Sequence, residues 1–236
     1  ESQSGVNGSE QENASSDSQK LQIVATIFPE YDWVKEILGD QADNVDLTLL
    51  LGNGTDMHSF QPTMEDILKV STCDLFIYVG GESDSWVADA LKGAGNPDRK
   101  AINLMDVLGD QVKEEEIVEG MQDEDGHTHE EEHTHDDDLE YDEHVWLSLK
   151  NASLFCDTIA SSLADADPEH SRLYQQNAEA YEEKLAALDQ EYQTSVEKSQ
   201  SKTLLFADRF PFRYLIDDYN LTYYAAFAGC SAETDA

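Results

Sequence analysis

The sequence is short of basic residues: 14 Lys and Arg stand against 51 Asp and Glu among 236 residues, a formal net charge of −37. A protein that binds nucleic acid needs a basic surface for the phosphates, and an anionic membrane surface would repel this chain. We therefore expect no nucleic-acid partner and a preference for cations. Hydrophobic residues make up 39% of the chain, which is enough for a folded core.

Long apolar runs are absent, because no segment approaches the roughly 18 consecutive apolar residues of a membrane-spanning helix. The chain starts at Glu1 without Met, and residues 1–20 are mostly Ser, Gln, Asn, Gly and Glu, which predicts a flexible tether. These features predict a processed monomer in the periplasm or at the cell surface. Its only membrane attachment would be a lipid anchor upstream of Glu1.

Cysteine is scarce: Cys73, Cys156 and Cys230 follow no pairing motif, and their odd number leaves at least one free or paired with another chain. We expect them to be small buried hydrophobic residues. A single disulfide between two of them stays open as an alternative.

Enzyme signatures are absent too: the sequence has no His-Glu-x-x-His, no Gly-x-Ser-x-Gly, no phosphate loop and no dinucleotide fingerprint. We expect no enzyme. A metal-dependent hydrolase stays open as an alternative, with Glu143 as its acid/base.

The apolar pattern predicts alternating strands and helices, which is typical of an α/β fold with a parallel sheet flanked by helices. After a helical middle region, the alternation resumes near residue 201 and stops after two strands. We therefore expect two lobes, residues 21–143 and 201–236, with a helical region at 144–200 and a truncated second lobe. The predicted strands are Leu21–Ile27, Val45–Leu51, Leu75–Val79, Ala101–Leu104, Lys202–Phe206 and Leu221–Phe227; the predicted helices are Tyr31–Leu38, Pro62–Val70, Ser85–Leu91, His144–Leu163, Pro168–Ser199 and Pro211–Asp218.

The negative charge is concentrated between Asp110 and Glu143, where 17 acidic residues accompany one Lys. An acidic loop at about 110–141 also carries two His-x-His pairs. Imidazole and carboxylate ligands suit Zn²⁺ and neighbouring ions, but the loop has too few apolar residues to fix its shape. We expect weak, exchanging metal occupancy at four residues: His127, His129, His133 and His135.

Two further His residues lie outside that loop. His58 stands in Gly54-Thr-Asp-Met-His-Ser-Phe-Gln-Pro62, between a predicted strand and a helix, where ligands of α/β sheets bind. His144 stands in Tyr141-Asp-Glu-His-Val-Trp-Leu, at a predicted helix start, with carboxylates that can orient or join a metal site. Taken singly, each motif leaves an alternative open. His58 would then be a loop residue that binds nothing, and His144 would be an exposed residue at a capped helix start.

Taken together, these motifs resemble the metal-binding lipoproteins of bacterial zinc and manganese ABC transporters. The two His motifs look like the first and second ligand motifs of that family. The His-rich loop before the second motif is typical of the zinc-specific branch, and the segment after Pro168 looks like its long rigid linker helix. The resemblance implies an extracytoplasmic receptor that binds Zn²⁺ through His58 and His144 and delivers it to an ABC permease. A manganese receptor and a surface adhesin stay open.

The resemblance also implies a third ligand after the first strand of the second lobe, and that position falls on Ala207, which cannot bind a metal. We expect Asp208, a loop His or a water to take its place. Glu233 and Asp235 near the end of the chain are further candidates.

Overall fold

The computed structural model describes residues 20–52, 54–93, 95–116, 118–119, 121 and 141–229. Residues 1–19, the four His of the acidic loop, Cys230, Glu233 and Asp235 lie outside the described residues. No described helix is both long enough and apolar enough to cross a bilayer.

A four-stranded parallel sheet in the order β2-β1-β3-β4 forms the first lobe. Alternate residues of its central strands face opposite sides, so that Ile23 and Ile77 enter one hydrophobic core while Val24 and Phe76 enter another. The predicted strands are confirmed, with ends that differ by a few residues. Their bounds are β1 Leu21–Ala25, β2 Val45–Leu49, β3 Leu75–Tyr78 and β4 Lys100–Asn103.

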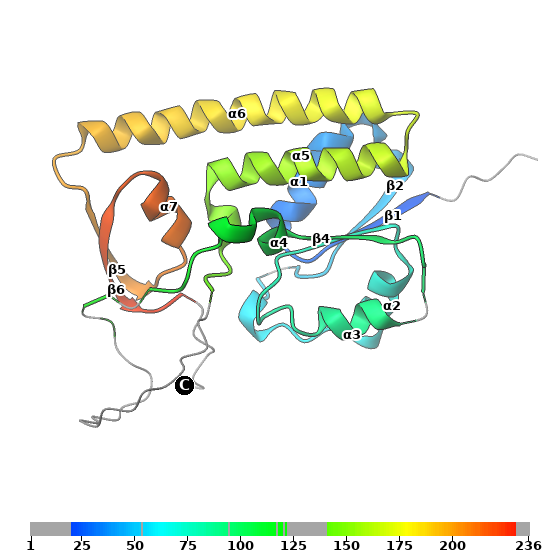
Figure 1. Cartoon of the computed structure of the whole chain (residues 1–236), viewed down its shortest axis with the longest axis horizontal. Coiled ribbons are helices and arrows are strands. Elements are labelled where there is room, and N and C mark those ends of the chain that lie inside the picture. The colour runs from blue at the N-terminus through cyan, green and yellow to red at the C-terminus, as the bar shows by residue number, and fades with distance from the viewer. Residues whose placement is uncertain are drawn as a thin grey trace, which may run out of the picture.

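Helices cover both faces of this sheet (Figure 1). The larger core joins the sheet to α1 and α5, and the smaller core joins it to α2 and α3. A helix on each face is what buried parallel strands need. The helices of this lobe are α1 Phe28–Leu38, α2 Met64–Thr72, α3 Val87–Lys92 and α4 Leu104–Leu108.

Two long helices follow, α5 (Leu149–Ala166) and α6 (Ser171–Lys198), and they pack side by side (Figure 1). With 28 residues, α6 is about 42 Å long, and it extends from the first lobe to the second. The predicted long helix is confirmed. The predicted helix from His144 is wrong at its start: residues Val145–Leu147 form one 3₁₀ turn, and α5 begins after Ser148, whose hydroxyl accepts the Asn151 N–H.

The second lobe contains two parallel strands, β5 (Thr203–Arg209) and β6 (Thr222–Phe227), joined through α7 (Arg213–Asp218). Tyr219, just after α7, stacks on Tyr192 of α6 at 5.6 Å and donates a hydrogen bond to Asp189 at 2.8 Å. These contacts fix the second lobe to the long helix.

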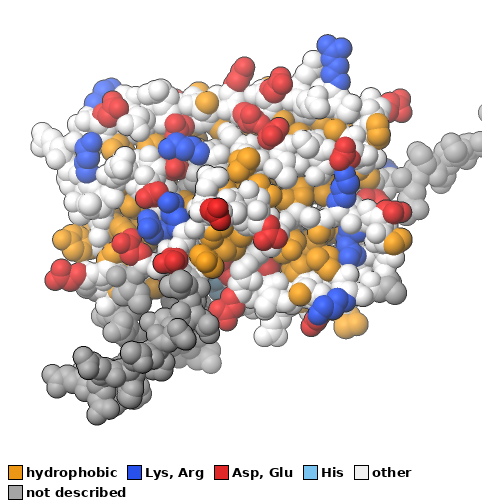
Figure 2. Space-filling view, viewed as in Figure 1, with side chains coloured by type: hydrophobic (Ala, Val, Ile, Leu, Met, Phe, Trp, Pro, Cys, Tyr) orange, Lys and Arg blue, Asp and Glu red, His pale blue; other side chains and the backbone are white. Residues whose placement is uncertain are grey.

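Cys73 and Cys156 are buried free thiols, and burial raises the pKa of each to about 12. The prediction of small buried hydrophobes is confirmed for these two residues. On the face in Figure 2, acidic and basic side chains are interspersed.

Candidate metal centre

His58 lies in the loop that follows β2, within a short 3₁₀ turn at Met57–Ser59. The carboxylate of Asp56 caps this turn and accepts the His58 backbone N–H at 3.0 Å. On the side chain, His58 Nδ1 lies 2.9 Å from the Ser83 hydroxyl. Backbone and imidazole are therefore both held, and the Nε2 atom points away from these partners.

His144 is buried, with 6% of its surface exposed. One oxygen of the Asp142 carboxylate accepts the His144 backbone N–H at 2.8 Å. The same oxygen lies 3.1 Å from His144 Nδ1. The Trp146 ring packs 5.3 Å from the imidazole. A carboxylate on Nδ1 is the usual partner of a metal-ligating histidine, because it fixes the tautomer and orients the ring.

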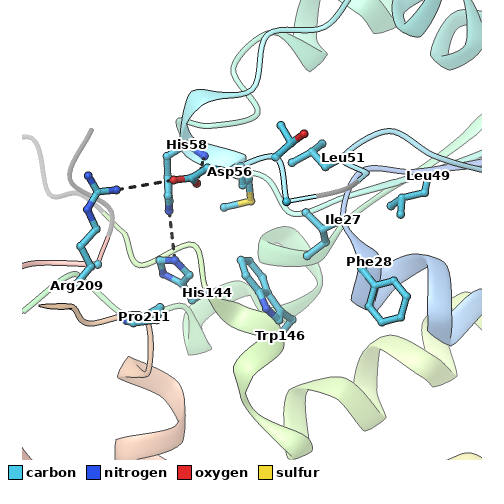
Figure 3. Close-up of a pocket in the computed structure, with 14 residues that line it drawn as sticks. Ile27, Phe28, Leu49, Leu51, Asp56, His58, His144, Trp146, Arg209 and Pro211 are labelled. Atoms are coloured by element: carbon cyan, nitrogen blue, oxygen red, sulfur yellow. Dashed lines mark hydrogen bonds and ion pairs between the residues drawn. The ribbon is translucent and has the colours of Figure 1, made fainter. Parts of the chain in front are cut away.

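The Nε2 atoms of His58 and His144 face each other at 3.3 Å (Figure 3). Two nitrogens about 2.0–2.1 Å from one tetrahedral ion would be about 3.3–3.4 Å apart. The pair therefore already has the spacing of two ligands of one tetrahedral zinc ion. The structure thus brings together the two His residues that the motifs singled out.

Glu143 lies behind this pair. Its Oε1 accepts the Ser83 N–H at 2.9 Å, and its Oε2, 3.6 Å from His58 Nδ1, has no hydrogen-bond partner among the described residues. Gly81, at φ +78°, leaves the room that this carboxylate fills, because a Cβ there would overlap the Glu143 side chain. A buried negative charge beside an imidazole favours a cation bound to that ring.

The pKa of His58 lies below its ordinary value of 6.5. Burial is the largest cause. Electrostatic interactions with His144 and Arg209 also lower the pKa of His58, whereas Glu143 and Asp56 raise it. His58 is therefore neutral at pH 7, which is the form that binds a metal.

A cavity of about 580 Å³ opens in front of the two imidazoles (Figure 3). Apolar side chains, among them Phe28 and Trp146, form one wall. The other wall comes from the second lobe and consists of Arg209, Pro211 and Gly229. Arg209 Nη1 lies 3.9 Å from the Asp56 carboxylate, so its guanidinium stands close to His58.

Asp208, the expected third ligand, is exposed and does not line this cavity; its carboxylate accepts the Arg209 backbone N–H instead. Ala207 is exposed as well. The strand β5 continues to Arg209, and that side chain lines the cavity. Among the residues that the structure describes, no three His, Cys, Asp or Glu side chains are grouped to hold a metal ion.

Tyr214 of α7 connects the second lobe to the His144 segment, a role that the sequence did not reveal. Its buried hydroxyl accepts the Lys113 N–H at 3.1 Å and donates to the Asp142 carbonyl at 2.8 Å. Lys113, near the start of the acidic loop, and Asp142, just after its end, are themselves joined by a backbone hydrogen bond of 2.9 Å. Tyr214 therefore fixes the base of the acidic loop and, through Asp142, the position of His144.

Residues 23–236 match the family described as the periplasmic component A of the zinc-uptake complex, ZnuA. The chain belongs to the ZnuA family. Two relatives illustrate the similarity. The zinc-binding lipoprotein AdcA of Streptococcus pneumoniae serotype 4 is 33% identical over 220 residues, which are 92% of this chain and 40% of AdcA. The high-affinity zinc uptake system protein ZnuA of Bacillus subtilis is 32% identical over 215 residues, 91% of this chain and 63% of that protein.

Solved structures of ZnuA-like receptors have the same fold. Zn(II)-bound AdcA from Streptococcus pneumoniae matches with a TM-score of 0.66 at 29% identity, over 87% of this chain and 39% of AdcA. The metal-dependent lipoprotein YcdH of Bacillus subtilis matches with a TM-score of 0.69 at 27% identity, over 87% of this chain and 67% of YcdH. The chain thus spans about two fifths of AdcA and under two thirds of the Bacillus subtilis ZnuA.

Proposed function

We propose that this ZnuA-family chain is an extracytoplasmic receptor that captures Zn²⁺ between His58 and His144 for an ABC importer. The observation that supports it most directly is the 3.3 Å separation of the two Nε2 atoms, each on an imidazole whose Nδ1 has a partner of its own. That arrangement directs two ring nitrogens toward the position of one ion.

The surrounding residues have separate roles in this mechanism. Asp142 and Ser83 hold the two rings in the binding tautomer, so that little reorganisation is needed when the ion enters. Glu143 and Asp56 place negative charge near the ion without being its ligands. The long α6 helix spans both lobes, and we expect metal binding to move loops rather than to close a wide hinge.

Zinc fits the nitrogen pair better than manganese, because Zn²⁺ favours imidazole in tetrahedral sites while Mn²⁺ prefers more oxygen ligands. Manganese is the second candidate. Solved structures at 22–23% identity include a Mn-bound periplasmic metal-binding protein from Candidatus Liberibacter asiaticus, which shares the fold. Competition between equal concentrations of the two ions separates them: preferential retention of Mn²⁺ contradicts the zinc assignment.

The remaining parts of the chain fit the same proposal. Residues 1–20 would be a tether to a lipid anchor, and His127, His129, His133 and His135 would collect ions and pass them to the site. Residues 21–143 and 201–236 would belong to two lobes joined by residues 144–200. We expect the receptor to act as a monomer with its permease and to catalyse no reaction.

A zinc titration of the double variant His58→Ala, His144→Ala tests the proposal. Competition with a chelator should show at least a hundredfold weaker binding, because both nitrogen ligands are lost. The matched control is His170→Ala, since His170 also has a carboxylate, Asp167, 2.7 Å from its Nδ1 but lies outside the cavity. Tight binding that survives the double substitution would contradict the receptor role of these residues and favour an adhesin. Chelator-sensitive ester hydrolysis would favour a hydrolase.

A further inference from the structure

We propose that α7 of the second lobe clamps the segment that carries His144 and thereby sets the zinc affinity of the first lobe, with Tyr214 as the positioning residue of this clamp. The proposal rests on the zinc site proposed above and concerns how one of its two imidazoles is kept in place. Tyr214 does not line the cavity in front of the imidazoles, so it would act through the residues that it holds.

The first end of the clamp is the bond between Tyr214 and Asp142. Both residues are 2% exposed, and the Tyr214 hydroxyl donates to the Asp142 carbonyl at 2.8 Å. The carboxylate of the same Asp142 holds the backbone N–H and the Nδ1 atom of His144. Asp142 is therefore fixed from the second lobe by its main chain while its side chain fixes His144. A buried group that loses such a partner is costly to accommodate, so the bond restrains Asp142.

The second end of the clamp lies four residues beyond His144. Asp218, the last residue of α7, accepts the hydroxyl hydrogen bond of Ser148 at 2.6 Å. Ser148 ends the 3₁₀ turn that follows His144 and caps α5. Tyr214 and Asp218 are four positions apart, so they lie on one face of α7, which packs against this turn (Figure 1). The helix thus holds residues 142–148 on both sides of His144.

His58 is held from within the first lobe instead. Asp56 caps its turn, and Ser83 lies 2.9 Å from its Nδ1. From the second lobe, Arg209 approaches Asp56 only to 3.9 Å, which is too long for a hydrogen bond. A displacement of α7 would therefore move His144 while His58 stayed in place.

The spacing of the two imidazoles makes this difference matter. Their Nε2 atoms are 3.3 Å apart, and two nitrogen ligands of one tetrahedral zinc ion need about 3.3–3.4 Å. The position of α7 therefore decides whether His58 and His144 can share an ion. A helix that contributes no side chain to the cavity would in this way control how tightly the ion is bound.

A second attachment of the same lobe provides the control. Tyr219, the residue after α7, is 4% exposed and donates to Asp189 of α6 at 2.8 Å. The hydroxyls of Tyr214 and Tyr219 thus make bonds of the same length from nearby positions. The first reaches the His144 segment, and the second reaches the long helix. Loss of either bond loosens the lobe, but only the first should disturb zinc binding.

The test measures zinc affinity and the rate of zinc release by chelator competition, in the full chain and in two variants. Tyr214→Phe keeps the ring but removes both hydrogen bonds of the hydroxyl, and it should weaken zinc binding about tenfold, chiefly through faster release. Tyr219→Phe should bind and release zinc as the wild type does. Urea denaturation of the metal-free proteins checks that both variants fold.

Two further readouts separate positioning from a general loss of stability. In ¹⁵N spectra of the metal-free protein, Tyr214→Phe should shift the imidazole signals of His144 toward a mixture of tautomers and leave those of His58 unchanged, because Asp142 selects the tautomer of His144 alone. In an Asp142→Asn background, Tyr214→Phe should weaken zinc by about threefold or less, since two residues that act through one contact are not additive. Asp218→Ala, at the other end of the clamp, should also weaken zinc binding.

Several results would overturn the proposal. Wild-type zinc affinity in Tyr214→Phe would remove its positioning role, whatever Asp218→Ala shows. Equal losses in Tyr214→Phe and Tyr219→Phe would show that any loosening of the lobe weakens zinc binding. A full tenfold loss in the Asp142→Asn background would show that Tyr214 does not act through Asp142.

If Tyr214→Phe does not fold, Asp218→Ala decides, and wild-type affinity in that variant would overturn the clamp. Failure of the zinc site itself is recognised separately. It would appear as a wild-type chain that does not bind zinc tightly, or as a His58→Ala, His144→Ala variant that still does.

Discussion

His58 Nε2 and His144 Nε2 lie 3.3 Å apart, although 86 positions separate the two residues in the sequence. The first imidazole is held by the loop after β2, and the second by the turn that precedes α5. Both loops are fixed by carboxylates, Asp56 and Asp142, that accept the backbone N–H of the His two positions later. The pair is therefore organised by short local turns that the sheet and α5 bring face to face.

Asp142→Asn should weaken zinc binding about 10- to 100-fold, because an amide polarises and orients the His144 ring less well than a carboxylate. Isothermal titration with a competing chelator measures the change. The matched control is Asp167→Asn, which alters the same kind of pair with His170 and should leave zinc affinity unchanged. Equal effects of the two variants would contradict a specific role for Asp142.

Zinc affinity should fall on acidification, because His58 must be neutral to bind the ion. Burial, together with electrostatic interactions with His144 and Arg209, holds the pKa of His58 below 6.5. Affinity should therefore change little between pH 8 and pH 7 and fall steeply only below about pH 6.5. Chelator competition at half-unit pH intervals measures the profile. An NMR titration of the His58 imidazole in the metal-free protein isolates this residue, and a midpoint above pH 6.5 would contradict its lowered pKa.

Gly81→Ala should lower the free energy of unfolding by about 2–4 kcal/mol, because φ is +78° and the new Cβ would overlap the Glu143 side chain. Zinc affinity should also fall as Glu143 is displaced. The control is Gly109→Ala, at φ +53° with no other atom within 4 Å of the new Cβ. It should also lower stability in urea denaturation, because φ +53° and ψ −123° suit only glycine, but it should leave zinc affinity unchanged.

Asp84 should make the metal-free protein less stable as the pH rises. Burial and, to a lesser extent, the charge of Glu143 raise the pKa of Asp84 to about 6 from 3.8. The folded state then holds a proton that the unfolded state releases above pH 3.8, so stability present at acid pH is lost as the pH rises through about 6. The loss from this one group is about 3 kcal/mol.

Asp84→Asn removes this titration while its amide oxygen still accepts the Gly80 N–H, a bond of 2.9 Å in the wild type. Urea denaturation from pH 4.5 to 8 should show the wild type losing stability relative to this variant as the pH rises. Asp89→Asn, at an exposed position of α3, should follow the wild type. A constant difference between wild type and Asp84→Asn across this range would contradict the raised pKa of Asp84.

Much of the fold follows from local sequence pattern. The β-branched segment at Ile23 and the apolar segment at Phe76 predict buried parallel strands, since both faces of such strands are covered. The apolar spacing that includes Ala178, Leu185, Leu188 and Tyr192 predicts α6. The structure buries Ala178 and Leu185 but leaves Leu188 and Tyr192 exposed. The predicted helix start at His144 was wrong, because a single 3₁₀ turn is too short to show a periodicity that differs from that of the helix after it.

The sequence by itself determined the α/β class, the long helix and the two His residues, because periodicity and short motifs depend on neighbouring positions. Only the tertiary structure decided that the two Nε2 atoms meet and that Tyr214 holds Asp142. It also decided that Arg209, rather than Ala207 or Asp208, reaches the cavity. The physical reason is strand register: a side chain at the end of β5 points into or away from the site according to single-residue shifts, and packing between the lobes sets that register.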